Sequence, residues 1–129
     1  MARSYHVEIA SFAAGADQKW VDNLLSRFGV PGVDSSKQGL SRRISDVGVY
    51  HIALIRELTA ELEVSTARAV TLAGQLLAVP GAVRLTEDIE MVFDRPSFER
   101  RIDARVAEAV ESIAPARRGR PPKRRAIGE

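Results

Sequence analysis

The sequence predicts a mainly α-helical fold with a small β-hairpin and a disordered basic tail. In several segments, apolar residues recur at helical spacing between a good capping residue and a glycine or proline. Residues 83–93 instead keep apolar side chains at a period of two, which indicates a small hairpin or one irregular strand. Residues 115–129 hold almost nothing apolar to bury, so we expect this tail to be disordered on its own.

The first elements lie between residues 5 and 39. The apolar segment 5–14 fits either a strand or a helix, and Gly15 ends it. Asp17 can cap a helix that runs to about Phe28. The buried positions expected in this helix are Trp20, Val21, Leu24 and Phe28. The glycines and the proline that follow predict a loop or a short hairpin.

The remaining helices each have a start signal. Ser45 or Asp46 can cap a long helix, and Ser65 can cap a second one that Pro80-Gly81 ends. The buried positions expected in the first are Val47, Leu54, Ile55, Leu58 and Leu62. Those expected in the second are Ala69, Leu72, Ala73, Leu76 and Leu77. Pro96 suits the start of a last helix of about five turns. Its apolar stripe consists of Phe98, Ile102, Val106, Ala109, Val110 and Ile113.

Length and composition limit the classes of protein to which the chain can belong. The 129 residues fit one small domain with one core, and the absence of cysteine excludes disulfides, cysteine-zinc sites and a thiol nucleophile. With two histidines, a histidine-rich metal site is not expected, and we predict no cofactor. No apolar run approaches the roughly 20 residues of a membrane span, and the N-terminus lacks a signal-peptide core. We therefore expect a cytoplasmic protein that binds no membrane.

Charge is segregated along the chain although the formal net charge is only +2. Residues 1–46 contain six basic and five acidic side chains, and residues 47–114 contain seven basic and eleven acidic ones. The tail 115–129 has six basic side chains against Glu129 alone. Such asymmetry is typical of a tail that binds nucleic acid or a membrane surface.

The tail contains the sequence Arg118-Gly119-Arg120-Pro121. Glycine lets the backbone approach closely and proline keeps it extended, which suits the narrow, negatively charged A·T minor groove. These residues resemble the core of an AT-hook, which implies that Arg118 and Arg120 insert into that groove. The other residues expected to contact DNA here are Arg117, Gly119, Pro121, Lys123, Arg124 and Arg125. The alternative is a solubilising tail that touches nucleic acid without preference.

Residues Ser11, Gly15 and Val21 have the spacing of a helix-turn-helix. The small residue allows close helix approach, the glycine supplies the turn, and the apolar residue fixes the second helix on the core. The outward side chains of that second helix would be Gln18, Lys19, Asn23 and Arg27. Asparagine and glutamine can pair with adenine, and lysine and arginine with guanine or phosphate.

The order of motifs from residue 5 to 77 resembles the winged helix-turn-helix head of MerR-family regulators. Gly29-Val30-Pro31 follows the second helix, and Gly39-Leu40-Ser41-Arg42-Arg43-Ile44-Ser45 precedes the long helix. The resemblance implies that Arg42 and Arg43, with Lys37 in the same loop, grip the DNA backbone. The sequence departs from the family at Trp20, where arginine is usual, and at Ile44, where tyrosine is usual. Trp20 fits a core anchor, and the alternative is a contact with DNA.

This resemblance predicts a DNA-binding head over residues 1–79, a hairpin and helix over 80–114, and the basic tail over 115–129. Because helix-turn-helix proteins commonly dimerise, we expect a homodimer. The residues considered for the dimer or partner interface are Phe98, Ile102, Val106, Val110 and Ile113. The same stripe can instead cover the domain's own core.

The function predicted from these motifs is sequence-specific binding of double-stranded DNA by a nucleoid-associated transcriptional regulator, not an enzyme, since no catalytic constellation is found. One alternative is a DNA-binding antitoxin whose acidic region, 47–114, binds a toxin. Another is an RNA-binding protein that uses the tail. His51 is expected to be packed and hydrogen-bonded, and the acidic residues near Glu87 to form a solvated turn.

Overall fold

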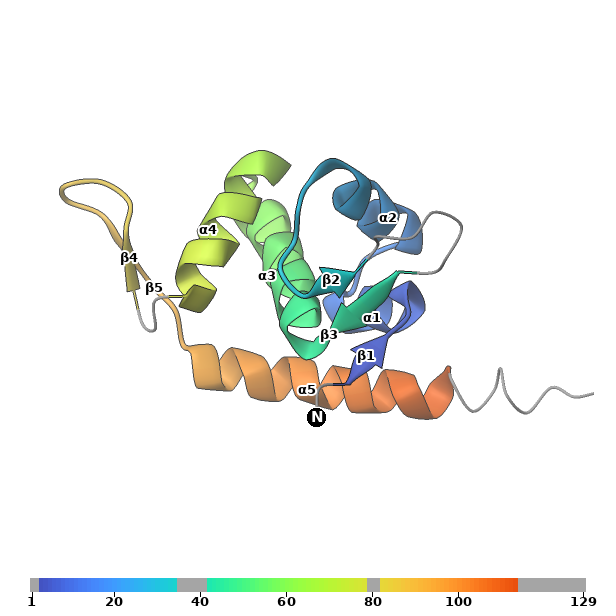
Figure 1. Cartoon of the computed structure of the whole chain (residues 1–129). Coiled ribbons are helices and arrows are strands. Elements are labelled where there is room, and N and C mark those ends of the chain that lie inside the picture. The colour runs from blue at the N-terminus through green and yellow to red at the C-terminus, as the bar shows by residue number, and fades with distance from the viewer. Residues whose placement is uncertain (1–2, 35–41, 79–81, 114–129) are drawn as a thin grey trace, which may run out of the picture.

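The computed structural model describes residues 3–34, 42–78 and 82–113, and over these ranges the chain is mainly helical. It contains helices α1 to α5, a three-stranded sheet and a two-stranded sheet in the described ranges (Figure 1). No helix in those ranges is both long and apolar enough to cross a membrane.

The segment 5–14, which fitted either a strand or a helix, contains the end of a strand followed by a helix. Strand β1 covers Ser4–Tyr5 and helix α1 covers Val7–Ala14, and helix α2 follows at Gln18–Arg27. Asp17 occupies the N-cap position of α2, as expected, although its side chain makes no capping hydrogen bond. Val21 and Leu24 are buried and Trp20 and Phe28 are half-buried, in agreement with the predicted apolar face.

The sheet next to these helices has the order β1-β3-β2 and is antiparallel throughout. Strand β2 covers Val33–Asp34 and the central strand β3 covers Arg43–Ser45. Ile44 on β3 pairs with Tyr5 on one side and Val33 on the other, and it is fully buried. The sheet therefore connects the start of the chain to the segment that follows α2.

Helix α3, Asp46–Leu62, runs through the centre of the molecule. Ser45 caps it, as predicted, by accepting a hydrogen bond from the Gly48 N–H at 3.3 Å. The predicted face is wrong at both ends, because Val47 and Leu62 are 51% and 50% exposed. Most of the circumference is buried instead, since other elements pack around this helix. Its buried residues are Gly48, Val49, His51, Ile52, Ala53, Leu54, Ile55 and Leu58.

The turn before β2 is held tightly against the start of α3. Gly32 has a φ of 85°, and its carbonyl accepts hydrogen bonds from the N–H of Ser45 at 2.8 Å and from the Ser45 hydroxyl at 3.1 Å. A Cβ at Gly32 would lie 2.4 Å from the Gly48 nitrogen. Only glycine satisfies both the backbone angle and this close approach.

Helix α4, Thr66–Ala78, packs along α3, and all five residues predicted for its buried face are buried. Ser65 caps it through a 3.1 Å hydrogen bond from the Arg68 N–H. Strands β4, Ala82–Arg84, and β5, Glu90–Val92, then form the predicted hairpin, which extends away from the helices (Figure 1).

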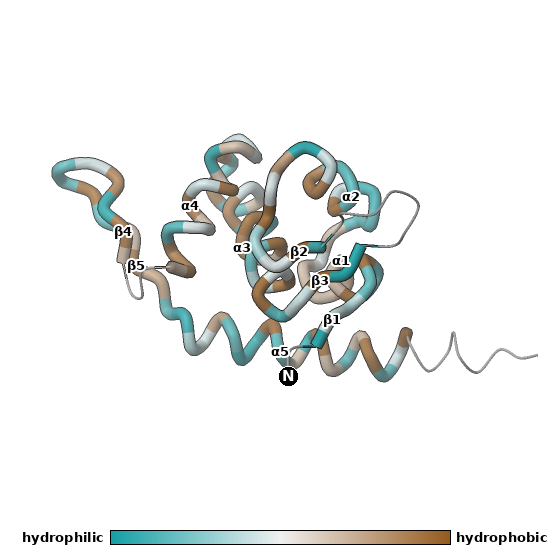
Figure 2. Tube along the Cα trace, in the orientation of Figure 1, coloured by the Kyte–Doolittle hydropathy of each residue, from teal (hydrophilic) through white to brown (hydrophobic). Residues whose placement is uncertain are grey.

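Helix α5, Arg95–Ser112, begins at an Asp94 cap and has Pro96 in its first turn. Figure 2 shows apolar residues recurring along this helix between polar ones. The helix packs on α1, and Phe98, Ile102 and Val106 are at most 6% exposed. The stripe therefore covers the chain's own core, which is the second of the two interpretations given to it.

Candidate nucleic-acid interface

The connection between α1 and α2 is a tight turn with the features that the residue spacing predicted. Ser11 is buried, and Val21 is fully buried. Gly15 ends α1 with a φ of 67°, a left-handed conformation that favours glycine. The Ala16 N–H donates to the Ser11 carbonyl at 3.0 Å, which closes the end of the helix. The direction of α2 is therefore fixed relative to α1.

Helix α5 reinforces this turn from a distant part of the sequence. The Arg105 guanidinium donates to the Ala13 carbonyl at 3.2 Å, one of the last acceptors of α1. Carbonyls at the end of a helix have no partner within the helix, so this bond satisfies one of them. The α1–α2 pair is thus supported by the last helix of the described chain.

The two faces of α2 differ completely in chemistry. Val21, Leu24 and Leu25 are buried on one face. Lys19, Asn23 and Arg27 are exposed on the other face, together with Ser26. Gln18, the fourth residue predicted to read DNA, is exposed at the first position of the helix, in line with Val21 and Leu25. The exposed amides and cations can donate to base edges and to phosphate oxygens.

Trp20 lies on the boundary between these faces. Its ring is half-buried and packs against the core, in agreement with the interpretation as a core anchor. The guanidinium carbon of Arg56 lies 5.2 Å from the centre of that ring, within cation–π distance. Trp20 also lines a depression of about 200 Å³ with Asn23, Arg27 and Thr66, so the exposed face of α2 continues into a shallow hollow.

Arg42, which the resemblance implied would grip the DNA backbone, is bonded to α2. Its Nη1 lies 3.2 Å from Asp22 Oδ1 and its Nη2 donates to Ser26 Oγ at 3.0 Å. Among the described residues, its buried Nε has no hydrogen-bond partner. The side chain is only 26% exposed, so Arg42 fixes the start of β3 to the polar face of α2.

Arg43, the first residue of β3, is exposed and bonds to residues at and next to β1. Its Nη2 donates to Ser4 Oγ at 2.9 Å, and its Nη1 lies 3.2 Å from His6 Nε2. A guanidinium has no acceptor, so the histidine nitrogen accepts this bond. These exposed hydrogen bonds hold Arg43 in a defined position beside the first residues of the described chain.

The remaining residues predicted to contact DNA cannot be placed. Lys37 and the tail residues 115–129 lie outside the described residues.

Most of the interface stripe on α5 is buried in the chain's own core, and the homodimer remains a prediction. The residues of that stripe are Phe98, Ile102, Val106, Val110 and Ile113, of which the last two are half-buried.

The acidic residues near Glu87 are exposed and belong to the hairpin turn. In the described ranges, no group of three or more histidine, aspartate or glutamate side chains is placed to hold a metal ion. His51 is 7% exposed, and its Nδ1 lies 2.9 Å from the Val47 carbonyl, which confirms the expectation that it is packed and hydrogen-bonded.

The polar contacts that hold α5 to the rest of the molecule were not predicted from the sequence. The Tyr50 hydroxyl donates to Asp103 Oδ1, and burial followed by this bond raises the pKa of Tyr50 well above its ordinary value. Arg101 forms an ion pair with Glu57 of α3. Opposite charges on two helical segments were the available signal, but nothing in the sequence indicated which charges meet.

No protein-family model, curated protein or solved structure matches the chain.

Proposed function

We propose that the chain is a sequence-specific double-stranded DNA-binding protein that regulates transcription. Helix α2 enters the major groove, and the paired strands β2 and β3 lie against the sugar-phosphate backbone as a wing. One observation supports this proposal most strongly: α2 exposes Asn23, Lys19 and Arg27 on one face while its opposite face is fixed on the core. Such an arrangement suits a recognition helix.

The chemistry of the exposed face suits base recognition. Gln18 and Asn23 can each donate to and accept from adenine, while Lys19 and Arg27 can bind guanine or phosphate. An α-helix with its side chains is about 10–12 Å wide, and the major groove of B-DNA is about 12 Å wide. The tight turn at Gly15 would carry α2 into the groove at a fixed angle.

The sheet edge supplies the second part of the proposed interface. Arg42 fixes β3 to α2, so the wing and the recognition helix would approach DNA as one unit. Arg43 is exposed on the same strand and would reach phosphates, with Lys37 in the preceding loop. In this proposal the basic tail adds minor-groove contacts, and two tethered modules increase each other's effective concentration.

The proposal is tested by removing cations from α2 and comparing that variant with a matched one. We expect Lys19→Ala/Arg27→Ala to weaken binding to a DNA library at least tenfold in fluorescence anisotropy. The slope of log affinity against log salt should fall by about 0.9 for each phosphate that the variant no longer neutralises. Arg84→Ala/Arg100→Ala removes the same charge from the hairpin and α5, and it should leave affinity nearly unchanged. Equal effects of the two variants would contradict the proposal.

A second measurement separates the head from the tail. Deleting residues 115–129 should lower the salt slope and any preference for A·T sequences. DNA selected from a random library should nevertheless share one motif with and without the tail, because base recognition is assigned to α2. If the motif disappears with the tail, the assignment of base recognition to α2 is wrong.

A further inference from the structure

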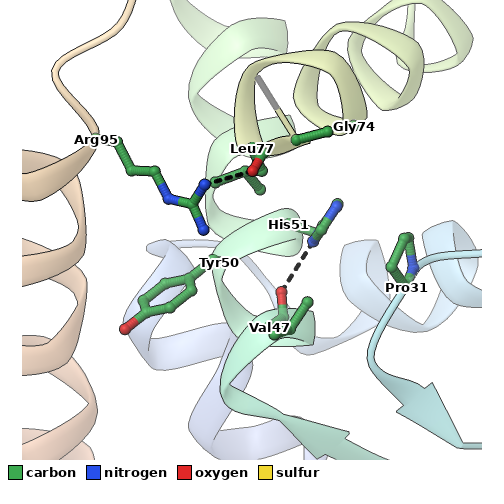
Figure 3. Close-up of a pocket in the computed structure, with 8 residues that line it drawn as sticks. Pro31, Val47, Tyr50, His51, Gly74, Leu77 and Arg95 are labelled. Carbon is green, nitrogen blue, oxygen red and sulfur yellow. Dashed lines mark hydrogen bonds between the residues drawn. The ribbon is translucent and has the colours of Figure 1, made fainter. Parts of the chain in front are cut away.

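A cavity of about 300 Å³ lies between α3, α4 and the turn that precedes β2 (Figure 3). Pro31 forms one wall, Val47 and His51 of α3 another, and Gly74 and Leu77 of α4 a third. The volume is at the lower end of the range for small-molecule sites. The cavity is separate from the polar face of α2, so the proposed DNA interface does not account for it.

Gly74 keeps this cavity open at a cost to its helix. It lies inside α4, where glycine is the poorest helix former after proline. No conformational reason requires it, because its φ is not positive. No packing reason requires it either, because a Cβ built at Gly74 would meet no atom within 4 Å. A larger side chain would project into the open space that Gly74 borders.

His51 places one polar atom on the cavity. Its Nδ1 lies 2.9 Å from the Val47 carbonyl, which can only accept, so Nδ1 carries the proton. Figure 3 shows the second ring nitrogen, Nε2, directed away from this bond toward the space between Gly74 and Pro31. In the neutral ring Nε2 is an acceptor. A molecule in the cavity would therefore satisfy it with a hydroxyl or N–H donor.

Arg95 is the one cation among the described residues that line the cavity, and its bonds do not leave it free for an anionic ligand. Arg95 donates through Nε to Glu99 Oε2 at 2.7 Å, and through Nη1 to the Leu77 carbonyl. Its charge is thus paired, and it closes the end of α4. The hydroxyl of Tyr50, which also lines the cavity, donates to Asp103 Oδ1. The remaining lining residues are apolar; they are Pro31, Val47, Gly74, Leu77 and Ala78. The lining favours a neutral molecule.

We propose that this cavity binds a compact, neutral, largely apolar molecule that donates one hydrogen bond to His51 Nε2, such as a substituted phenol. The apolar walls take up the ring, and His51 orients the hydroxyl. This inference does not rest on DNA binding, since it concerns a different surface and is measured without DNA.

The test uses the full chain and two probes of similar size, p-cresol and toluene, followed by NMR. We expect p-cresol to bind saturably with a Kd of about 1 mM or tighter, as suits so small a ligand. It should shift the His51 imidazole nitrogens, with His6 as the internal control. Toluene lacks the hydroxyl and should bind about fivefold more weakly, the value of one hydrogen bond.

A variant of the cavity wall makes the test specific. Gly74→Leu should fill the cavity and weaken p-cresol binding more than tenfold, while circular dichroism stays unchanged and the thermal midpoint does not fall. Gln75→Leu places the same side chain on the exposed face of α4 and should bind p-cresol like the parent. Three results would each overturn the proposal: no saturable p-cresol binding, equal binding of toluene, or p-cresol binding by Gly74→Leu at parental affinity.

Discussion

Helices α2 and α5 are both amphipathic, yet they use their polar faces differently. The polar face of α2 carries amides and cations that are exposed, and one acidic residue, Asp22, that is bonded to Arg42. The polar face of α5 carries acids and bases in balance, and several of them bond to other elements. Tyr50, for example, donates to Asp103 of α5. The apolar faces of both helices are buried in one core.

This difference shows that an apolar stripe predicts burial but not the partner that buries it. The stripe of α5 suited a second subunit as well as the chain's own core, and α1 occupies it. Function has to be sought on the face that remains. On α2 that face is chemically suited to nucleic acid, whereas on α5 it is tied to the protein. Substitutions on the two helices test this contrast, from the largest expected effect to the smallest.

The largest effect should come from α5. Ile102 is fully buried, so Ile102→Ala leaves a cavity between α5 and α1 and should lower the free energy of unfolding by about 2–5 kcal/mol. Urea denaturation measures this loss. The control is Glu108→Ala on the exposed face, whose free energy of unfolding should stay within about 0.5 kcal/mol of that of the parent. If Ile102→Ala left stability unchanged but altered the oligomeric state, the apolar stripe of α5 would have to be a dimer interface.

A smaller and more selective effect is expected on α2. Asn23→Ala should cost about 1–3 kcal/mol of discrimination at one base pair without lowering stability, because Asn23 is exposed. Selection from a random library would show one position of the motif relaxed. Lys19→Ala is the comparison, since removing a cation that binds phosphate should weaken all sequences alike. A motif unaltered by Asn23→Ala would exclude this side chain from base recognition.

The acidic residue on α2 gives a test of opposite sign. Asp22→Asn removes a negative charge from the polar face, and its amide oxygen can still accept from Arg42 Nη1. We expect DNA affinity to rise about threefold, which is a change of under about 1 kcal/mol in the binding free energy. Glu87→Gln removes an equal charge from the exposed hairpin turn and should have no such effect. Affinity that falls with Asp22→Asn would show that the ion pair itself, not the net charge, matters to binding.

The smallest effect at neutral pH concerns the contact between α3 and α5. Burial and the bond to Asp103 raise the pKa of Tyr50, so above the ordinary tyrosine pKa of about 10 unfolding releases a proton. The stability of the parent protein should therefore fall as the pH rises through that range. The stability of Tyr50→Phe should fall less steeply, because this variant lacks the titrating hydroxyl. Thermal midpoints at about pH 9, 10 and 11 would show it. Some slope should remain, because burial also raises the pKa of Tyr5. Parallel curves would contradict the assignment.

The sequence alone determined the features that depend on neighbours within a turn or two of helix. Ser45 and Ser65 begin their helices because their side chains accept from backbone N–H groups three residues later. The buried face of α4 followed from helical spacing. The exposed face of α2 followed in the same way, so all four of its predicted contact residues are exposed.

Only the tertiary structure decided which distant groups meet. Arg42 turns to Asp22 and Ser26, and Arg105 reaches Ala13 across 92 positions of sequence. The segment 5–14 became a strand and a helix because Tyr5 pairs with Ile44, far along the chain. Helical spacing placed Val47 on the apolar face of its helix, yet it is 51% exposed. Local spacing fixes which face of an element is apolar, whereas long-range packing chooses what covers it and where a cavity such as that beside Gly74 remains.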